Sequence, residues 1–522
     1  MNGAQALIRT LAACGVDVCF TNPGTSEMHF VAALDDVPEV RGVLGLFEGV
    51  VTGAADGYAR VAGKPAATLL HLGPGLANGW ANLHNARRGF TPVVNIVGDH
   101  ATHHKRFDAP LESDIEALAG ALKGWVRVSA TSEQLADDAA DAVAAATAGR
   151  GQVATLVLPA DVSWSDARGP AEPRTAPASS ARDGNQIDEI ADALRRGEPT
   201  GLLVGGRVVA GEDGLIAAGR VAAAASAKLL CETFPARLAR GAGLPAVERL
   251  AYLGELAEWQ LAGLRHLVVV DTTAPVSFFA YPGKPSELTP DGCTVHVLGG
   301  DGVDPTAALQ ALAEALGAPA DIDRAAAARP DAPTGELTAE SMAAAIGHLL
   351  PEGAIVSDEG NTSGLFVPGA TAGCARHDWL TLTGGSIGQG MPVATGAGVA
   401  AQASGDGRKV VNLQADGSAL YTIQSLWTQA REGLDVTTVI LNNRSYAILN
   451  MELARVGATE PGPTALSMLD LGRPDLDFCA LATGMGVSAE RATTADEFTA
   501  AFERALASDG PALVEAILPD TL

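Results

Sequence analysis

The feature that most constrains the fold is a pair of polar side chains, each shortly after an apolar run in the last third of the chain. Asp416 follows residues 410–413, Asn443 follows residues 438–441, and 26 residues separate the two. A helix-like stretch, residues 423–433, lies between the runs. The order strand, helix, strand predicts one βαβ unit of a parallel sheet, with a polar side chain at the carboxyl end of each strand.

The carboxyl ends of parallel strands meet at one edge of a sheet, where doubly wound sheets hold their ligands. Mg²⁺ prefers carboxylate and carbonyl oxygens together with phosphate oxygens. Asp416, Asn443 and the backbone carbonyl of Ser445 would supply the protein's share of such a site. An ordinary Asp-Gly turn and a chance Asn pair are the alternative interpretation.

Composition narrows the classes of function. The chain is 47% hydrophobic and 18% charged, as in globular proteins, and its net charge is −26. Such a polyanion does not favour nucleic acid or anionic lipid, so neither is expected as a partner. The six cysteines show no paired spacing, no apolar run is long enough to span a membrane, and no signal-peptide pattern is present. We therefore expect a cytoplasmic protein with reduced cysteines.

Two stretches rich in Pro, Ala and small polar residues divide the chain. They cover residues 166–185 and 317–336 and have the composition of exposed connections. They separate three blocks, residues 1–165, 186–318 and 336–522. In each block, β-branched runs alternate with Ala-rich helical stretches. This alternation predicts three tandem α/β domains, each with a doubly wound parallel sheet.

The spacing of Asp416 and Asn443 resembles the diphosphate-anchoring motif of the thiamine-diphosphate enzymes, Gly-Asp-Gly followed at a similar distance by Asn-Asn. Ala415 stands here in place of the first glycine. The three-block layout resembles the branch that contains acetolactate synthase, benzoylformate decarboxylase and pyruvate decarboxylase, with the pyrimidine-binding domain first, a central domain next, and the diphosphate-binding domain last. The nearest resemblance is to acetolactate synthase large-subunit-like proteins. It implies thiamine diphosphate and Mg²⁺ as cofactors, with Asp416, Asn443 and Ser445 as metal ligands.

The resemblance also assigns the pyrimidine end of the cofactor. Residues 48–60 are similar to the family's glutamate motif, which implies that Glu48 bonds to the pyrimidine ring nitrogen and activates the cofactor. Residues 384–392 resemble the family's wedge segment, which places Ile387 under the bend of the cofactor and the Gly385 carbonyl beside its amino group. A helix-capping acid and an ordinary Gly-rich turn are the alternatives.

Phosphate-binding groups follow from the same resemblance. It implies that backbone amides around Gly417, Ser418 and Tyr446, together with Asn361, meet the phosphate oxygens. Ser418 opens a predicted helix, whose amino end suits an anion.

Three residues are candidates on the substrate side. Thr25 lies in residues 22–27, which resemble the family's Asn-Pro-Gly-Ser/Thr loop beside the reacting carbon. His71 falls where benzoylformate decarboxylase has an active-site histidine. The His103-His104 pair falls near the paired histidines of pyruvate decarboxylases, which makes His104 a candidate as well. A histidine with a pKa near neutral suits proton transfer, and a hydrogen-bonded structural histidine is the alternative.

Two departures bear on the reaction. Pyruvate decarboxylases carry an Asp where this chain has Thr25, and a Glu where it has Leu449. Those acids help to release aldehyde, so their absence favours decarboxylation of a 2-oxo acid followed by carboligation, as in acetolactate synthase. The alternatives are a non-ligating decarboxylase of the benzoylformate decarboxylase type and a catalytically silent cofactor-binding relative.

The resemblance has further consequences for partners. Biosynthetic acetolactate synthases also hold FAD in the central domain, but this chain has no Gly-x-Gly-x-x-Gly pattern and only Gly205-Gly206-Arg207 as a weak substitute, so FAD is doubtful. In this branch the site forms between the first domain of one subunit and the last domain of another, which implies a homodimer and predicts a homotetramer. The donor and acceptor substrates, and a small regulatory subunit, stay open.

Overall fold

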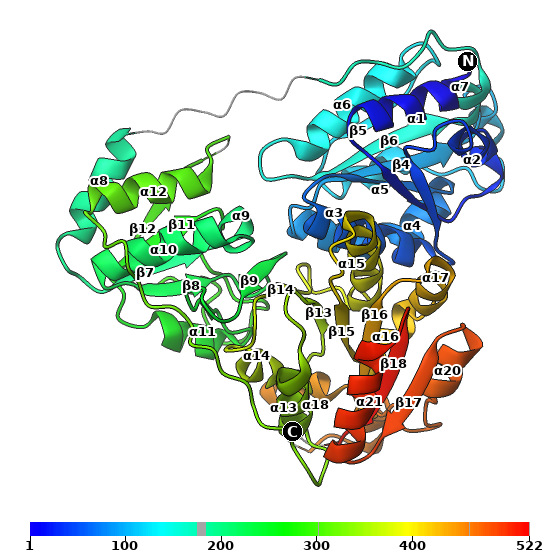
Figure 1. Ribbon diagram of the computed structural model, residues 1–522. Coiled ribbons are helices and arrows are strands. Elements are labelled where there is room, and N and C mark those ends of the chain that lie inside the picture. Colours follow the sequence, from blue (N-terminus) through cyan, green and yellow to red (C-terminus); the bar gives the residue numbers. More distant parts are fainter. Residues whose placement is uncertain (175–183, 301, 459, 521–522) are drawn as a thin grey trace.

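Three α/β units make up the chain, and the computed structural model describes residues 1–174, 184–300, 302–458 and 460–520 of it. Figure 1 shows the first unit in blue and cyan, the central unit in green and the last unit in olive to red. Each unit contains one sheet, and among the described residues every pairing of strands is parallel except one at the edge of the third sheet. The predicted class, three tandem parallel α/β domains, is confirmed.

The first sheet has the strand order β2-β1-β3-β4-β6-β5. Its strands are β1 (Val18–Thr21), β2 (Arg41–Leu44), β3 (Ala66–Leu70), β4 (Val93–Asp99), β5 (Val126–Val128) and β6 (Val153–Pro159). Its helices are α1 (Gly3–Ala13), α2 (Met28–Leu34), α3 (Glu48–Ala62), α4 (Leu72–Arg88), α5 (Ile115–Gly120), α6 (Leu135–Thr147) and α7 (Ala160–Trp164). The three strands β3, β4 and β6 are buried along their whole length, as expected where helices cover both faces of a parallel sheet.

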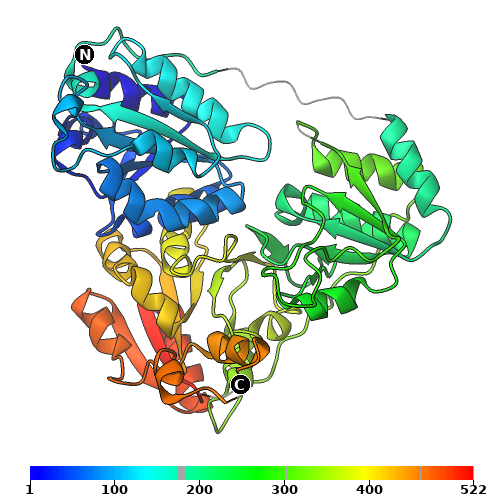
Figure 2. The ribbon, with the colours of Figure 1, turned by 180° about the vertical axis from the view of Figure 1, so that it is seen from behind.

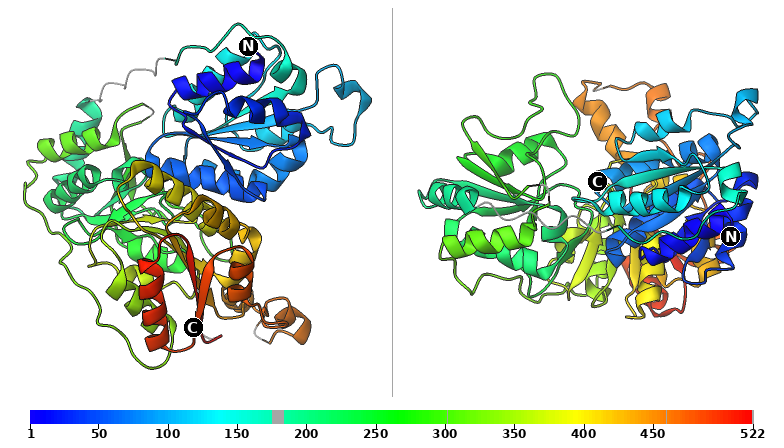
Figure 3. Two further views of the ribbon diagram at one scale, coloured as in Figure 1. Left: turned by 45° about the vertical axis from the view of Figure 1, so that its right-hand side comes forward. Right: turned by 90° about the horizontal axis from the view of Figure 1, so that it is seen from above.

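The central sheet has the order β10-β8-β7-β11-β12. Its strands are β7 (Thr200–Val204), β8 (Lys228–Cys231), β10 (Glu248–Arg249), β11 (His266–Val270) and β12 (Thr294–Leu298). Its helices are α8 (Gly184–Leu194), α9 (Gly206–Val209), α10 (Glu212–Ala225), α11 (Gly254–Leu261) and α12 (Pro305–Ala315). Seen from above, this unit lies to one side of the other two (Figure 3). Part of the predicted connection before it, residues 175–183 of 166–185, lies outside the described residues.

The third sheet has the order β17-β18-β16-β15-β13-β14-β9. Its strands are β13 (Ile355–Glu359), β14 (His377–Leu380), β15 (Val410–Ala415), β16 (Val436–Asn442), β17 (Ser488–Ala492), β18 (Ala512–Ile517) and β9 (Leu238–Arg240). Its helices are α13 (Ala339–Leu349), α14 (Val367–Ala370), α15 (Gly390–Ser404), α16 (Asp416–Thr422), α17 (Ser425–Glu432), α18 (Ala447–Arg455), α19 (Pro463–Ser467), α20 (Phe478–Gly484) and α21 (Ala495–Ala507). Strand β9 comes from the middle of the chain and pairs antiparallel with β14, so the central and last units share a sheet edge.

Helices α3 and α15 join the first unit to the last, and Figure 2 shows this contact from behind. They approach closely because small residues face each other. A Cβ added at Gly396 would lie 1.8 Å from the Ala54 carbonyl oxygen, and one at Gly57 would lie 2.1 Å from the Val393 carbonyl oxygen. A single apolar core therefore includes residues of both units, such as Val51 and Val393.

No helix in the described ranges combines the length and the apolar character that crossing a membrane requires.

Candidate functional site

Asp416 and Asn443 stand at the carboxyl ends of two neighbouring strands. Strand β15 pairs in parallel with β16, with Ala415 opposite Leu441, so both polar residues reach the same edge of the third sheet. The predicted strand, helix, strand order is present, although the connection forms two helices, α16 and α17, instead of one.

The Asp416 carboxylate is nearly buried, with 3% of the residue exposed. Its Oδ1 accepts the Gly417 amide at 2.7 Å, and its Oδ2 accepts the Arg444 amide at 2.7 Å. Burial raises the pKa of Asp416 to about 6, even though these backbone donors act to lower it. Arg444 has a φ of +58°, so the turn after β16 adopts a left-handed conformation to aim its amide at this carboxylate.

Asn443 is fixed by two hydrogen bonds. Its Oδ1 accepts the Ser445 amide at 3.0 Å, and its Nδ2 donates to the Ser363 hydroxyl at 3.2 Å. The second bond brings the turn that contains Asn361 beside the ends of β15 and β16. Asn361 is exposed and has a φ of +48°.

The remaining predicted phosphate-side residues gather at the same edge. The Tyr446 ring covers Gly417 so closely that a Cβ there would lie 2.3 Å from the ring. The Ser418 hydroxyl accepts from Gln414 Nε2 at 2.6 Å and donates to the Ala415 carbonyl at 3.1 Å. Because that hydroxyl is engaged internally, the backbone amides of this segment are the better anion donors.

Gly385 and Ile387 lie in the loop before α15. Gly385 has a φ of +73°, and a Cβ on it would meet the Phe278 ring at 2.4 Å, so both backbone conformation and space require glycine. Ile387 is half-buried. The buried Glu359 carboxylate anchors this loop, because it accepts the amides of Gly388 and Gly390, each at 2.6 Å. Burial raises the pKa of Glu359 above its ordinary value.

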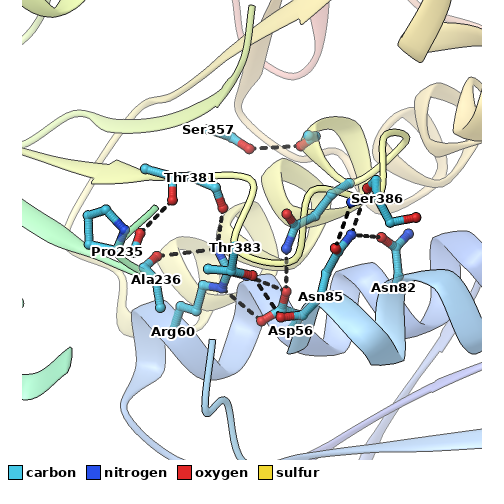
Figure 4. A network of polar contacts seen from close by, with 12 residues as sticks. Asp56, Arg60, Asn82, Asn85, Pro235, Ala236, Ser357, Thr381, Thr383 and Ser386 are labelled. Carbon is cyan, nitrogen blue, oxygen red and sulfur yellow. Dashed lines mark hydrogen bonds and ion pairs between the residues drawn. The ribbon is translucent and has the colours of Figure 1, made fainter. Parts of the chain in front are cut away.

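The same loop is tied to the first unit (Figure 4). Asn85 in α4 donates to the Ser386 carbonyl at 2.8 Å. Arg60 in α3 pairs with Asp56 at 2.6 Å, and both side chains are almost fully buried. Arg60 also donates to the Thr381 carbonyl at 2.8 Å and to the Thr383 hydroxyl at 2.9 Å. A buried ion pair with its remaining donors satisfied holds a defined geometry, so the loop position is fixed from two directions.

Glu48 is the first residue of α3, and it is 7% exposed. Its Oε2 accepts from Asn78 Nδ2 of α4 at 3.1 Å. Among the described residues no side-chain hydrogen bond joins this carboxylate to the last unit, so the structure does not bring Glu48 into bonded contact with Asp416.

His71 is held against the loop of residues 22–27. Its Nδ1 lies 2.8 Å from Glu27 Oε2, and a Cβ on Gly24 would lie 2.1 Å from the ring. Glu27 is buried and also accepts the Ser26 hydroxyl at 2.8 Å. Thr25 is exposed on the same loop. The structure therefore places Thr25 and His71 together.

His103 and His104 lie elsewhere, on an exposed turn after β4. The nearest charged contact of His103 is Asp161 at 3.8 Å, with the imidazole 70% exposed. The His104 ring packs 5.4 Å from the ring of His100 and 5.7 Å from that of Phe107. No hydrogen bond or ion pair described for this turn connects it to His71.

Several polar residues of this region are absent from the set predicted from sequence. They are Glu27, which holds His71; Asn78, which holds Glu48; Glu359, which holds the loop before α15; and the Asp56–Arg60 pair. One signal was available for the asparagines, because Asn78, Asn82 and Asn85 recur at helical spacing and so share a face of α4.

The fold and this site define a class of protein. Two protein-family models match the sequence. The family "Thiamine pyrophosphate enzyme, N-terminal TPP binding domain" matches residues 1–123, and "Thiamine pyrophosphate enzyme, C-terminal TPP binding domain" matches residues 371–516. The chain belongs to the thiamine pyrophosphate enzymes, which confirms the family predicted from the sequence.

Individual relatives narrow this assignment. The chain is 58% identical to the "Putative acetolactate synthase large subunit IlvX" of Mycobacterium tuberculosis, over 99% of both chains. It is 29% identical to the benzoylformate decarboxylase of Pseudomonas aeruginosa, over 96% of both chains. A solved structure, the thiamine diphosphate-dependent 4-hydroxybenzoylformate decarboxylase of Rhodococcus jostii RHA1, superposes with a TM-score of 0.84 at 25% identity and covers 99% of each chain.

Proposed function

We propose that this protein is a thiamine-diphosphate- and Mg²⁺-dependent enzyme that decarboxylates a 2-oxo acid and joins the remaining acyl unit to a second carbonyl compound, as an acetolactate synthase does. The observation that carries the proposal is the shared sheet edge of Asp416 and Asn443. The loop of Gly385 and Ile387 is anchored in the same unit by Glu359.

The donor set fits a hard divalent cation. The side-chain oxygens of Asp416 and Asn443 and the Ser445 carbonyl are all oxygen ligands of the kind that Mg²⁺ takes. Burial raises the pKa of Asp416 to about 6, and a bound cation would favour its ionised form. The amides of Gly417, Ser418 and Tyr446, with Asn361, would hold the diphosphate.

Glu48 is proposed to bind the pyrimidine ring nitrogen and to exchange a proton there, with its carboxylate oriented by Asn78. Gly385 would present its carbonyl to the amino group, and Ile387 would support the bent cofactor. Thiamine diphosphate, when bound, supplies the electron sink for loss of carbon dioxide from a 2-oxo acid.

His71 is proposed to transfer protons on the substrate side, beside Thr25, with His104 as a more distant candidate. The Glu27 carboxylate fixes the orientation of His71 at 2.8 Å. This pair supports a second candidate function, a non-ligating decarboxylase of the benzoylformate decarboxylase type, because an oriented imidazole can protonate a product on its way to aldehyde. Thr25 and Leu449, in place of the acids of pyruvate decarboxylases, support ligation. The presence of Glu48, Asp416 and Asn443 together argues against a catalytically silent relative.

No side-chain hydrogen bond described within one chain joins Glu48 to the last unit, and the resemblance places the site between the first unit of one subunit and the last unit of another. We therefore propose a homodimer at minimum and a homotetramer as the complete assembly. Large apolar side chains near the Asp416 edge are exposed in one chain, including Tyr421 at 53% and Leu449 at 44%. Exposed apolar surface beside a site is typical of an interface. Light scattering on the cofactor-loaded protein tests this, and a monomer would overturn it.

The reaction itself is tested by resolving products. The purified protein would be supplied with thiamine diphosphate and Mg²⁺, then with pyruvate, 2-oxobutyrate or benzoylformate. Carbon dioxide together with a hydroxy-ketone or acetolactate-type product would support the proposal. Aldehyde without ligation would move the protein to the second candidate, and absence of turnover on every acid would contradict both for these donors. Glu48→Gln serves as the control for protein-dependent turnover.

A further inference from the structure

The turn at the carboxyl end of β7 is closed by the chain's own carboxylates. The Gly206 amide donates to Glu232 Oε1 at 3.1 Å, and the Arg207 amide donates to Asp271 Oδ2 at 2.7 Å. The carboxylates lie directly on the turn, because a Cβ added at Gly205 would be 2.6 Å from Glu232 and one at Gly206 would be 2.4 Å from Asp271.

Both carboxylates are held in place by further partners. Glu232 accepts from the Thr272 hydroxyl at 3.0 Å. Asp271 lies 3.1 Å from Arg150 Nε and 3.4 Å from Arg207 Nε, and its side chain is only 4% exposed. Its backbone has a φ of +52°, which few residues other than glycine, asparagine and aspartate adopt readily.

Arg150 belongs to the first unit, so Asp271 also connects two units. The Arg150 guanidinium carbon lies 3.7 Å from the centre of the Phe90 ring, and its terminal nitrogen donates to the Asp271 carbonyl. The positive charge of Arg150 is therefore already used by a partner within the chain.

To bind at this turn, the diphosphate of a dinucleotide would need the amides of Gly206 and Arg207 and a nearby arginine as hydrogen-bond donors. Diphosphates bind at the carboxyl ends of parallel strands through the free amides of a Gly-rich turn and through nearby cations. Here two of the turn's amides donate to carboxylates of the chain, and Arg150 and Arg207 both form ion pairs with Asp271. A cavity of about 630 Å³ is lined by residues of all three units, and its lining includes Glu232 and Thr272 but neither glycine of the turn.

We infer that Glu232 and Asp271 take the place of a diphosphate at this turn, that the central unit is closed to FAD, and that the protein works without a flavin. The ion pair of Asp271 with Arg150 instead connects the central unit to the first unit. The inference concerns the central unit and does not depend on which 2-oxo acid reaction the protein performs.

The first test is flavin binding by the purified full-length protein. Denatured protein is assayed for released flavin, and native protein is titrated with FAD while flavin fluorescence anisotropy and thermal unfolding are followed. No released flavin, unchanged anisotropy and an unchanged unfolding temperature are expected, because a ligand that binds only the folded state would stabilise it. Flavin in near-equimolar amount, or saturable binding of added FAD, would overturn the inference, whatever the outcome of the product assay.

The second test uses amide hydrogen exchange at residues 206–207. Asp271→Gly keeps the left-handed backbone and removes the acceptor, whereas Asp271→Asn keeps both the conformation and one acceptor oxygen. Exchange at Arg207 is expected to be roughly tenfold faster in Asp271→Gly, from loss of one hydrogen bond to a charged group, and near that of the native protein in Asp271→Asn. Equal exchange in all three proteins, or protection of the native protein by FAD, would contradict the inference.

Discussion

Glu359 and Gly388 are joined by a hydrogen bond of 2.6 Å from the amide to the buried carboxylate, directly after Ile387 in the chain. The other carboxylate oxygen accepts the Gly390 amide and Gln414 Nε2 at 3.0 Å. One acidic side chain at the end of β13 therefore sets the position of the loop proposed to support the cofactor.

Replacing this acid should loosen that loop. In Glu359→Gln one acceptor oxygen becomes an amide that faces a backbone donor, so we expect a loss of about 1–3 kcal/mol in the free energy of unfolding. Turnover should fall as well, because Ile387 is no longer held. Urea unfolding and the product assay measure the two effects, with the exposed Glu352→Gln as the control. Native-like stability and turnover would contradict the positioning role.

Glu48→Gln should abolish most turnover and leave the fold intact. A misplaced or missing acid–base group costs about 10²–10⁴-fold in rate. The amide can still bond to Asn78, so the free energy of unfolding should change little. Steady-state kinetics and thermal unfolding check this, with the exposed Glu39→Gln as a matched substitution. Substantial activity in Glu48→Gln would refute the proposed role.

Removal of the metal should release the cofactor. We expect EDTA to weaken thiamine diphosphate binding and added Mg²⁺ to restore it in the native protein but not in Asp416→Ala. With Mg²⁺ present throughout, thiamine diphosphate at about 100 times its Kd should stabilise the folded state by about 2.7 kcal/mol, seen as a higher unfolding temperature. The exposed Asp509→Ala should behave like the native protein. Metal-independent binding by Asp416→Ala would exclude this ligand set.

Acid should destabilise the protein through His377 of β14. Burial lowers the pKa of this imidazole from 6.5 to about 4. Because the unfolded chain takes up the proton first as pH falls, stability is present above pH 6.5 and is lost as pH falls toward 4, by about 3 kcal/mol. In His377→Gln the free energy of unfolding should fall less steeply as pH decreases over this range. Replacement of the exposed His103, in His103→Gln, should leave the pH dependence of the native protein unchanged. Identical pH profiles for all three proteins would rule out the assignment.

The sequence predicted the fold class because hydrophobic runs alternate with helical stretches, and it predicted the neighbouring ends of β15 and β16 because a βαβ connection leaves few other arrangements. The split of the connection into α16 and α17 was not predicted, since helical composition continues across the break. Glu27, Asn78 and Glu359 escaped notice because their partners are distant in sequence. A buried acid that accepts backbone amides leaves no periodic pattern.

The contact between α3 and α15 has a consequence for how the chain holds together. Gly57 and Gly396 each touch the backbone of the opposite helix, and the buried Asp56–Arg60 pair reaches across to Thr381. The first and last units therefore pack directly against each other, although the central unit separates them in the sequence. A chain cleaved between its first and central units would therefore migrate as a single particle, and an exchange of the first unit between relatives would succeed only if both sides of this seam were exchanged together.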